Sequence, residues 1–128
     1  MHEALFQAAR QAMARSHSPY SNFPVGAAIK TASGAIYSGC NIENAAFPEG
    51  WCAETSAIAH MIMAGETKIA EVLVVAEKMD QITPCGGCRQ RISEFAAADT
   101  PIHLCDQHGV TQTVTLGDLL PAGFDLEK

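Results

Sequence analysis

Three cysteines and one glutamate are the residues of this sequence with the clearest capacity for chemistry. They stand in two short runs, Cys52-Ala53-Glu54 and Pro84-Cys85-Gly86-Gly87-Cys88. Cysteine thiolates are preferred zinc ligands, and three protein ligands leave the fourth tetrahedral position open for water, as in catalytic zinc sites. We therefore expect a catalytic Zn²⁺ held by Cys52, Cys85 and Cys88.

Glu54 follows the first ligand by two positions. On a helix this spacing turns the carboxylate away from the metal's own ligands while leaving it able to reach the bound water. A carboxylate in that place can carry protons. A glutamate within a helix is ordinarily a solvated surface residue, and only the neighbouring cysteine motifs favour Glu54 as the catalytic residue.

Two other uses of the cysteines stay open at this point. A lone Cys-x-x-Cys also occurs in thioredoxin-like redox sites, although the third cysteine upstream favours a metal. Cys40 or Cys105 could supply a fourth thiolate and so close a purely structural zinc site. We expect both instead to be core thiols, because each follows a strand-like apolar pattern.

The charge of the expected centre constrains its surroundings. A zinc ion with three thiolates carries a net charge of −1, which opposes ionisation of the bound water. The N-terminus of a helix offers about half a positive charge and unpaired amides. Helices that begin near Cys52 and Cys85 would therefore offset part of this charge.

The elements that must position these residues can be read from the periodicity of apolar side chains. Within the stretch over 71–76 the residues from 72 on are all apolar, which predicts a central strand buried on both faces. Strands that alternate with helices predict one α/β domain over residues 1–128, with helices on both faces of the sheet. The expected elements, in chain order, are a helix over 5–13, strands over 25–31 and 35–39 joined by a hairpin turn, a helix over 52–64, a strand over 71–76, a helix from Cys85 to about 97, and strands over 102–105 and 112–115.

Composition favours a small substrate. The chain has 14 acidic and 8 basic residues, a formal net charge of −6, and no basic stripe. Nucleic-acid and membrane-surface binders are usually basic, so we expect neither partner. The apolar run over 72–76 is too short to span a bilayer, and no run of signal-peptide length precedes Arg10. We expect a cytoplasmic protein.

Several stretches together resemble the small homotetrameric cytidine deaminases. Besides the Cys-Ala-Glu and Pro-Cys-x-x-Cys runs, they are Pro19-Tyr20-Ser21-Asn22-Phe23-Pro24-Val25-Gly26-Ala27-Ala28, Gly39-Cys40-Asn41-Ile42-Glu43-Asn44-Ala45-Ala46 and Leu119-Leu120-Pro121. The resemblance runs nearly from end to end. It implies a three-layer α/β/α fold with a mixed five-stranded sheet, and a homotetramer with shared sites.

The resemblance also implies a reaction and roles for further residues. Cytidine or deoxycytidine would be hydrolysed at C4 to uridine or deoxyuridine, with Glu54 moving protons and ammonia leaving. Asn41 and Glu43 would hold the ribose hydroxyls, and Phe23 would pack beside the nucleoside. Phe124 would reach into a neighbouring subunit's site. Pyrimidine salvage is the expected setting, and no organic cofactor is needed.

Two departures from the family pattern open further questions. Family members with three cysteines commonly read Cys-Ala-Glu-Arg, but this chain has Thr55, which lacks the guanidinium's charge. We hypothesise that Arg89 or Arg91 compensates. The run from Phe47 to Trp51 is also unusual, so deamination of a modified or antibiotic aminopyrimidine nucleoside remains an alternative. A noncatalytic zinc-binding module is the alternative from another functional class.

Overall fold

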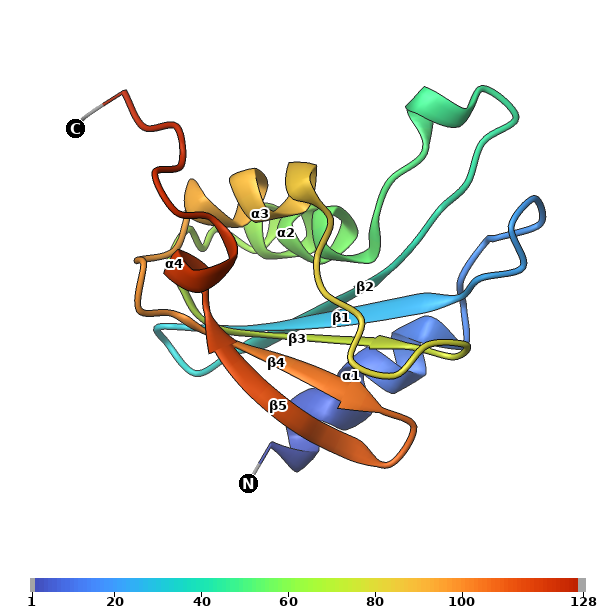
Figure 1. Ribbon diagram of the computed structural model, residues 1–128, viewed down its shortest axis with the longest axis horizontal. Helices are drawn as coiled ribbons and strands as arrows, with labels where there is room; N and C mark the ends of the chain where they lie inside the picture. The colour runs from blue at the N-terminus through green and yellow to red at the C-terminus, as the bar shows by residue number, and fades with distance from the viewer. Residues whose placement is uncertain (1, 127–128) are drawn as a thin grey trace.

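A computed structural model describes residues 2–126 of the chain (Figure 1). Its strands are β1 (Val25–Thr31), β2 (Ile36–Cys40), β3 (Ile69–Ala76), β4 (Pro101–Asp106) and β5 (Gly109–Thr115). Its α-helices are α1 (Glu3–Met13), α2 (Ala53–Met63), α3 (Gly86–Ser93) and α4 (Leu116–Leu119), and a 3-10 turn, η1, spans Phe47–Glu49.

The strands form one mixed sheet in the order β2-β1-β3-β4-β5. β1 pairs antiparallel with both β2 and β3, β3 pairs parallel with β4, and β4 pairs antiparallel with β5. β3 is thus the central strand, as its continuous apolar run predicted. Buried on both faces, it has no place for alternating polar side chains.

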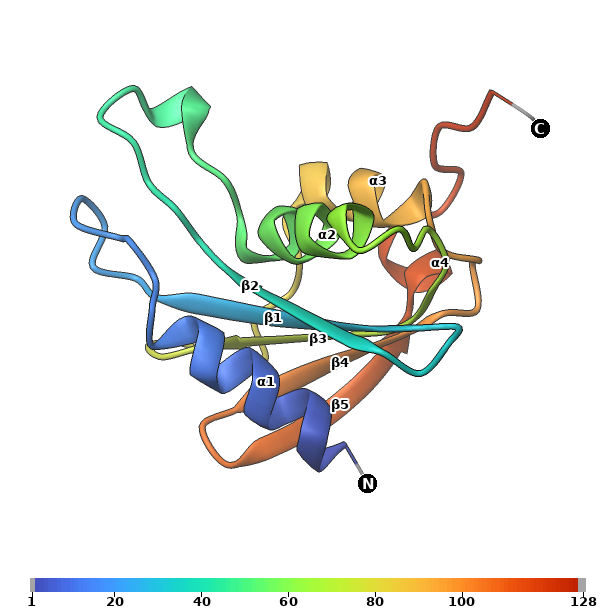
Figure 2. The ribbon, with the colours of Figure 1, turned by 180° about the vertical axis from the view of Figure 1, so that it is seen from behind.

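Helices cover both faces of this sheet (Figures 1 and 2). α1 lies on one face, where Leu5, Phe6, Ala9 and Met13 pack against Ala28, Leu73, Val75 and Cys105. α2 and α3 lie on the other, where their apolar side chains pack against Ala27, Ile29, Val72, Val74, Ile102 and Leu104. Neighbouring residues of one strand thus serve opposite cores, since strand side chains alternate. The predicted three-layer α/β/α fold is confirmed.

The bounds of two predicted elements differ from the structure by more than two residues. The helix expected to run from Cys85 to about residue 97 ends at Ser93. Beyond it the backbone tightens, because Phe95 N donates to Ile92 O at 3.0 Å, and Phe95 O accepts a hydrogen bond from Ile69 N at 2.9 Å. The backbone after α3 is therefore hydrogen-bonded to the start of β3 instead of continuing the helix. The last strand begins at Gly109 rather than 112.

α2 lies unusually close to the edge strand β2. A Cβ atom on Gly39 would lie 2.4 Å from Ala57 N and 2.6 Å from the Cβ of Ser56. Glycine alone permits this approach, which Ser56 reinforces by donating from its hydroxyl to Cys40 O at 2.8 Å. Gly39 therefore sets the position of the helix that begins immediately after Cys52.

Two loops project together beyond the end of the sheet, one before β1 and one between β2 and α2 (Figures 1 and 2). Glu43 N donates to His17 O at 2.7 Å, and Ile42 and Trp51 exchange two backbone hydrogen bonds of 2.9 Å. Hydrogen bonds thus join segments that are distant in sequence.

None of the helices among residues 2–126 combines the length and apolar character needed to cross a membrane.

Candidate active site

Two of the three predicted zinc ligands are the N-cap residues of helices. Cys52 precedes α2 and Cys85 precedes α3, each with an extended backbone conformation. Their carbonyls accept the first helical hydrogen bonds, from Ser56 N at 3.1 Å and from Arg89 N at 2.9 Å. Each sulfur therefore lies beside the positive end of a helix, as the sequence predicted.

The third predicted ligand, Cys88, lies in the first turn of α3 and is buried. Sγ of Cys52 lies 3.6 Å from Sγ of Cys85, and all three sulfurs lie within 4.8 Å of one another. Zn–S bonds of about 2.3 Å place the sulfurs of a tetrahedral site about 3.8 Å apart. The cluster has the donor set and the spacing that zinc requires.

The other two cysteines lie outside this cluster. Cys105 is buried in the core beneath α1, as predicted, and Cys40 is half-buried on β2. Among the described residues, the thiol cluster therefore contains three sulfurs rather than four. A site with three protein ligands leaves one tetrahedral position for water, which disfavours the closed structural alternative.

The cluster concentrates negative charge on Cys88. A hydrogen bond from Cys52 lowers the pKa of Cys88 to about 5, with help from Thr55, Cys85 and Arg91, while burial opposes the shift. The same contact to Cys88, together with burial, raises the pKa of Cys52. A thiolate on Cys88 is a competent metal ligand, because metals bind the deprotonated form.

Glu54 lines a small cavity together with two of the three cysteines. Its side chain is 4% exposed. The cavity has a volume of about 120 Å³ and is lined by Val25, Cys52, Ala53, Glu54, Val74, Ile82, Thr83 and Cys85. Burial first, and then the charge of Cys88, raises the pKa of Glu54 to about 7, although Arg91 acts in the opposite direction. A carboxyl group with this pKa both takes up and releases protons at neutral pH.

The structure separates the two arginines that were candidates to replace the family's missing charge. Nη1 of Arg91 donates to Cys88 Sγ at 3.8 Å. The Arg89 guanidinium instead donates to Pro84 O at 2.7 Å and to Leu119 O at 3.0 Å, so it fastens α4 to the segment before Cys85. Arg91 is the arginine in contact with a thiolate.

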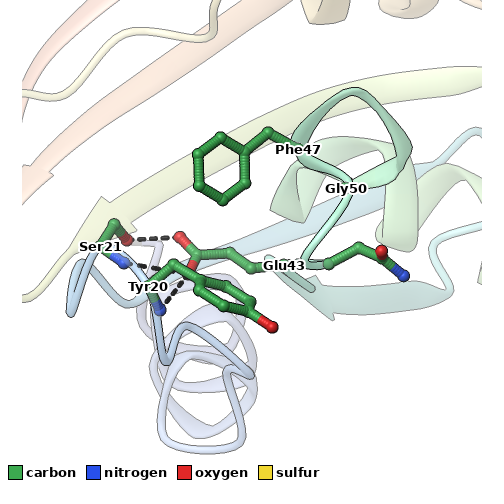
Figure 3. A pocket seen from close by; sticks show the side chains of 6 residues that line it. Tyr20, Ser21, Glu43, Phe47 and Gly50 are labelled. Atoms are coloured by element: carbon green, nitrogen blue, oxygen red, sulfur yellow. Dashed lines mark hydrogen bonds between the residues drawn. The ribbon is translucent and has the colours of Figure 1, made fainter.

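A second pocket, of about 300 Å³, lies between the two projecting loops (Figure 3). Its lining residues are Tyr20, Ser21, Glu43, Asn44, Phe47 and Gly50. The rings of Tyr20 and Phe47 meet edge to face, with centroids 5.7 Å apart, and the Phe47 side chain is 73% exposed. The pocket combines one carboxylate with open aromatic surface, a combination suited to a ligand with hydroxyl groups and a flat ring.

The Glu43 carboxylate is fixed by the opposite loop of this pocket. Its Oε1 accepts hydrogen bonds from Tyr20 N at 2.9 Å and from Ser21 N at 3.1 Å, and its Oε2 accepts one from the Ser21 hydroxyl (Figure 3). The Ser21 hydroxyl and, less strongly, these two amides lower the pKa of Glu43, although burial opposes them. Glu43 is therefore an oriented anion at neutral pH.

Asn41, the other residue expected to hold ribose, is occupied with the protein itself. Its Oδ1 accepts from Ser16 Oγ at 2.5 Å and from Val25 N at 2.9 Å, and its Nδ2 donates to Phe23 O at 2.9 Å. Val25 lines the cavity of Glu54. Asn41 thereby ties the loop that carries Phe23 to the wall of the cavity, and one N–H of its amide stays available to a ligand.

The two predicted aromatic contacts lie in different places. Phe23 is half-buried, and it lines neither the pocket of Glu43 nor the cavity of Glu54. Phe124 lies beside α3, with its ring 70% exposed, and lines a groove with residues of α3 and the C-terminal segment. Within this chain the structure does not bring Phe124 to the thiol cluster.

Sequence reasoning missed the residues that hold the site in shape. Ser16 and Ser21 fix Asn41 and Glu43 through hydrogen bonds between distant loops, and nothing in their local sequence signals such partners. Tyr20 was recognised only as part of a longer stretch, and Phe47 only as part of the unusual run from Phe47 to Trp51, without a role of its own.

A second group of possible metal ligands consists of His2, Glu71 and His103. His103 Nε2 lies 3.1 Å from Glu71 Oε1 and its Nδ1 lies 2.8 Å from Thr113 Oγ1, so both ring nitrogens have partners. The two imidazole rings overlap, with centroids 4.0 Å apart, and Lys30 Nζ approaches the same carboxylate at 4.0 Å. These contacts form a charge network that fastens the start of α1 to the sheet.

Comparison with known proteins yields a consistent result. The family model for the cytidine and deoxycytidylate deaminase zinc-binding region matches residues 1–104. The cytidine deaminase of Sporosarcina psychrophila is 38% identical over 125 residues, covering 98% of this chain and 92% of that protein. The crystal structure of cytidine deaminase from Burkholderia pseudomallei is 39% identical, with a TM-score of 0.90 over 97% of this chain and 99% of that chain. For cytidine deaminase from Mycobacterium tuberculosis, the identity is 32% and the TM-score 0.87, over 97% of each chain.

Proposed function

Because the chain belongs to the cytidine and deoxycytidylate deaminase family, we propose that it converts cytidine and deoxycytidine to uridine and deoxyuridine by zinc-dependent hydrolysis, with release of ammonia. One observation carries the proposal. The buried Glu54 carboxyl shares a cavity of about 120 Å³ with two sulfurs of the thiol cluster.

Cys52, Cys85 and Cys88 are the residues proposed to hold zinc, which supplies Lewis-acid activation of water when bound. Glu54 accepts the proton that the attacking water gives up and delivers it to N3 of cytosine. Glu54 then takes the second proton of the added water, now on the C4 hydroxyl, and gives it to the amino group, so that the C–N bond breaks with ammonia leaving and a C4 carbonyl forming. The raised pKa of Glu54 suits both steps, because at neutral pH the carboxylate can accept a proton and the carboxylic acid can release it again.

The nucleoside is proposed to extend from this cavity toward the pocket between the loops. Glu43, oriented by Ser21 and Tyr20, accepts hydrogen bonds from a sugar hydroxyl, and the remaining N–H of Asn41 donates one. Phe23 is proposed to lie beside the nucleoside. This arrangement favours a nucleoside over the free base cytosine, since the base lacks the hydroxyl groups that these residues bind.

The assembly we propose is a homotetramer in which Phe124 completes a neighbouring subunit's site. The high exposure of the Phe124 ring within one subunit supports this role, because burying a large aromatic side chain against a neighbouring subunit lowers the free energy of the assembly. We further propose that residues 1–128 act as one domain and that the protein works in the cytoplasm, in pyrimidine salvage.

The decisive experiment measures loss of cytosine absorbance and release of ammonia with cytidine, deoxycytidine, cytosine and a blasticidin-type nucleoside. Activity on the first two, with little on cytosine, is the expected result. Preference for the blasticidin-type nucleoside would favour the antibiotic-modifying alternative. Glu54→Gln should retain one zinc per subunit and lose deamination, whereas a parent protein inactive on every pyrimidine nucleoside would favour a noncatalytic zinc module.

A further inference from the structure

The charge on the proposed zinc site needs a positive partner that the family pattern does not supply here. Three thiolates and Zn²⁺ together carry −1, and the residue after Glu54 is the neutral Thr55. Thr55 Oγ1 lies 3.6 Å from Cys88 Sγ, close enough for one hydrogen bond but without a charge. The helix ends at Cys52 and Cys85 face the other two sulfurs.

Arg91 brings a full positive charge to the remaining sulfur. It follows Cys88 by three residues on α3, so both side chains emerge from the same face of the helix. Its Nη1 donates to Cys88 Sγ at 3.8 Å. The guanidinium keeps its charge under all physiological conditions, so its attraction for the thiolate is permanent.

Gly87 provides the room for this contact. A Cβ atom at Gly87 would lie 3.2 Å from Nη1 of Arg91, closer than such contacts normally come. A side chain there would press on the guanidinium that contacts Cys88. A larger residue at Gly87 would therefore require the flexible end of the Arg91 side chain to shift by a few tenths of an ångström.

We propose that Arg91 is the positioning residue that compensates the thiolate charge in this protein, taking from α3 the part that an arginine after the catalytic glutamate would play from α2. The proposal rests on the proposed zinc site and concerns affinity and electronic tuning. Thr55 and Arg91 contact the same sulfur, so the hydroxyl and the guanidinium act together on Cys88. Arg89 has a different task, since its guanidinium is engaged by carbonyls of the fold.

The test measures zinc affinity by competition with a chelator, in the absence of any nucleoside. Arg91→Gln should weaken zinc binding roughly 10- to 100-fold, the range seen when a partner of a metal ligand is lost. Arg10→Gln, the control, removes an exposed arginine on α1. Its zinc affinity should stay within about twofold of the parent's, a difference that we count as no change. Adding Thr55→Arg to Arg91→Gln should restore most of the loss.

A spectroscopic readout separates charge compensation from general packing. In the cobalt-substituted protein, loss of the guanidinium makes the Cys88 thiolate easier to oxidise, so the sulfur-to-cobalt charge-transfer band should move to longer wavelength. Arg91→Lys should lie between the parent and Arg91→Gln, since a lysine keeps the charge but lacks the planar fork. If Arg91→Gln does not fold, the lysine variant and its rescue by Thr55→Arg decide the question.

Unchanged zinc affinity and an unchanged cobalt band in these Arg91 variants would overturn the proposal. Both measurements are made without substrate, so they keep their meaning if the parent deaminates no nucleoside. Conversely, the parent protein could deaminate normally while the Arg91 substitutions leave zinc affinity unchanged. That result would uphold the proposed function and remove only the role of Arg91.

Discussion

Gln90 holds the backbone of Phe124 through both of its polar groups. Gln90 Nε2 donates to Phe124 O at 3.0 Å, and Phe124 N donates to Gln90 Oε1 at 3.2 Å. Gln90 belongs to α3, the helix that carries Cys88. The exposed ring of Phe124 is therefore presented from a fixed backbone that is anchored two residues from a proposed zinc ligand.

A subunit-mixing experiment tests whether this ring acts in a neighbouring site. Phe124→Ala and Glu54→Gln should each lose most activity when they are prepared alone. Tetramers formed from both should regain activity, because a site with an intact Glu54 can receive Phe124 from a Glu54→Gln subunit. No gain on mixing, at a composition confirmed by native mass spectrometry, would place Phe124 outside its neighbour's site.

The pH dependence of turnover should follow Glu54. Its pKa is raised to about 7, first by burial and then by the charge of Cys88. The carboxylate must be ionised to accept a proton from water, so kcat/KM should fall as the pH drops below about 7. Glu54→Gln should lower kcat by roughly 10²–10⁴-fold and remove this limb from its residual activity. A parent profile that stays flat down to pH 5 would contradict the role.

Much of this fold was predictable from the chain because its signals are local. Continuous apolar runs marked β3, and helical spacing marked α1 and α2. The short α4 was missed although Thr115 and Asp118 form a capping box, a pattern that can be recognised in a sequence. The end of α3 was missed for another reason, since Phe95 O bonds to Ile69 N, a partner distant in sequence.

The same distinction between local signals and distant partners applies to the candidate site. Spacing alone predicted a zinc site of three thiolates with a glutamate that carries protons. The structure brings these residues together: Cys52, Cys85, Cys88 and Glu54. The sequence prediction left the choice between Arg89 and Arg91 open, although a residue three positions after Cys88 shares its helix face and the next residue does not. The direction of each guanidinium in the structure confirms the distinction.

The packing of α2 on β2 should make Gly39→Ala costly. The added methyl group would meet Ala57 N at 2.4 Å, and backbone atoms cannot rotate away as a side chain can. Overpacking of this kind costs about 1–3 kcal/mol, to be measured by urea denaturation of the zinc-free protein. Ser38→Ala, one residue earlier on the same strand, is the matched control and should change stability by less than about 0.5 kcal/mol. Equal stabilities for the two variants would show that α2 adjusts freely.

Ser21→Ala should weaken nucleoside binding more than it slows the chemical step. The Ser21 hydroxyl bonds to Glu43 Oε2, and its loss leaves that oxygen freer to rotate away from a bound sugar. A hydrogen bond to a charged group contributes about 1.5–3 kcal/mol, so we expect KM for cytidine to rise about tenfold with kcat nearly unchanged. Glu43→Gln should raise KM further, because an amide is a weaker acceptor than a carboxylate. Substrates without the sugar hydroxyls should lose little in either variant, whereas an equal loss for cytidine and cytosine would show that Ser21 supports the fold rather than ribose recognition.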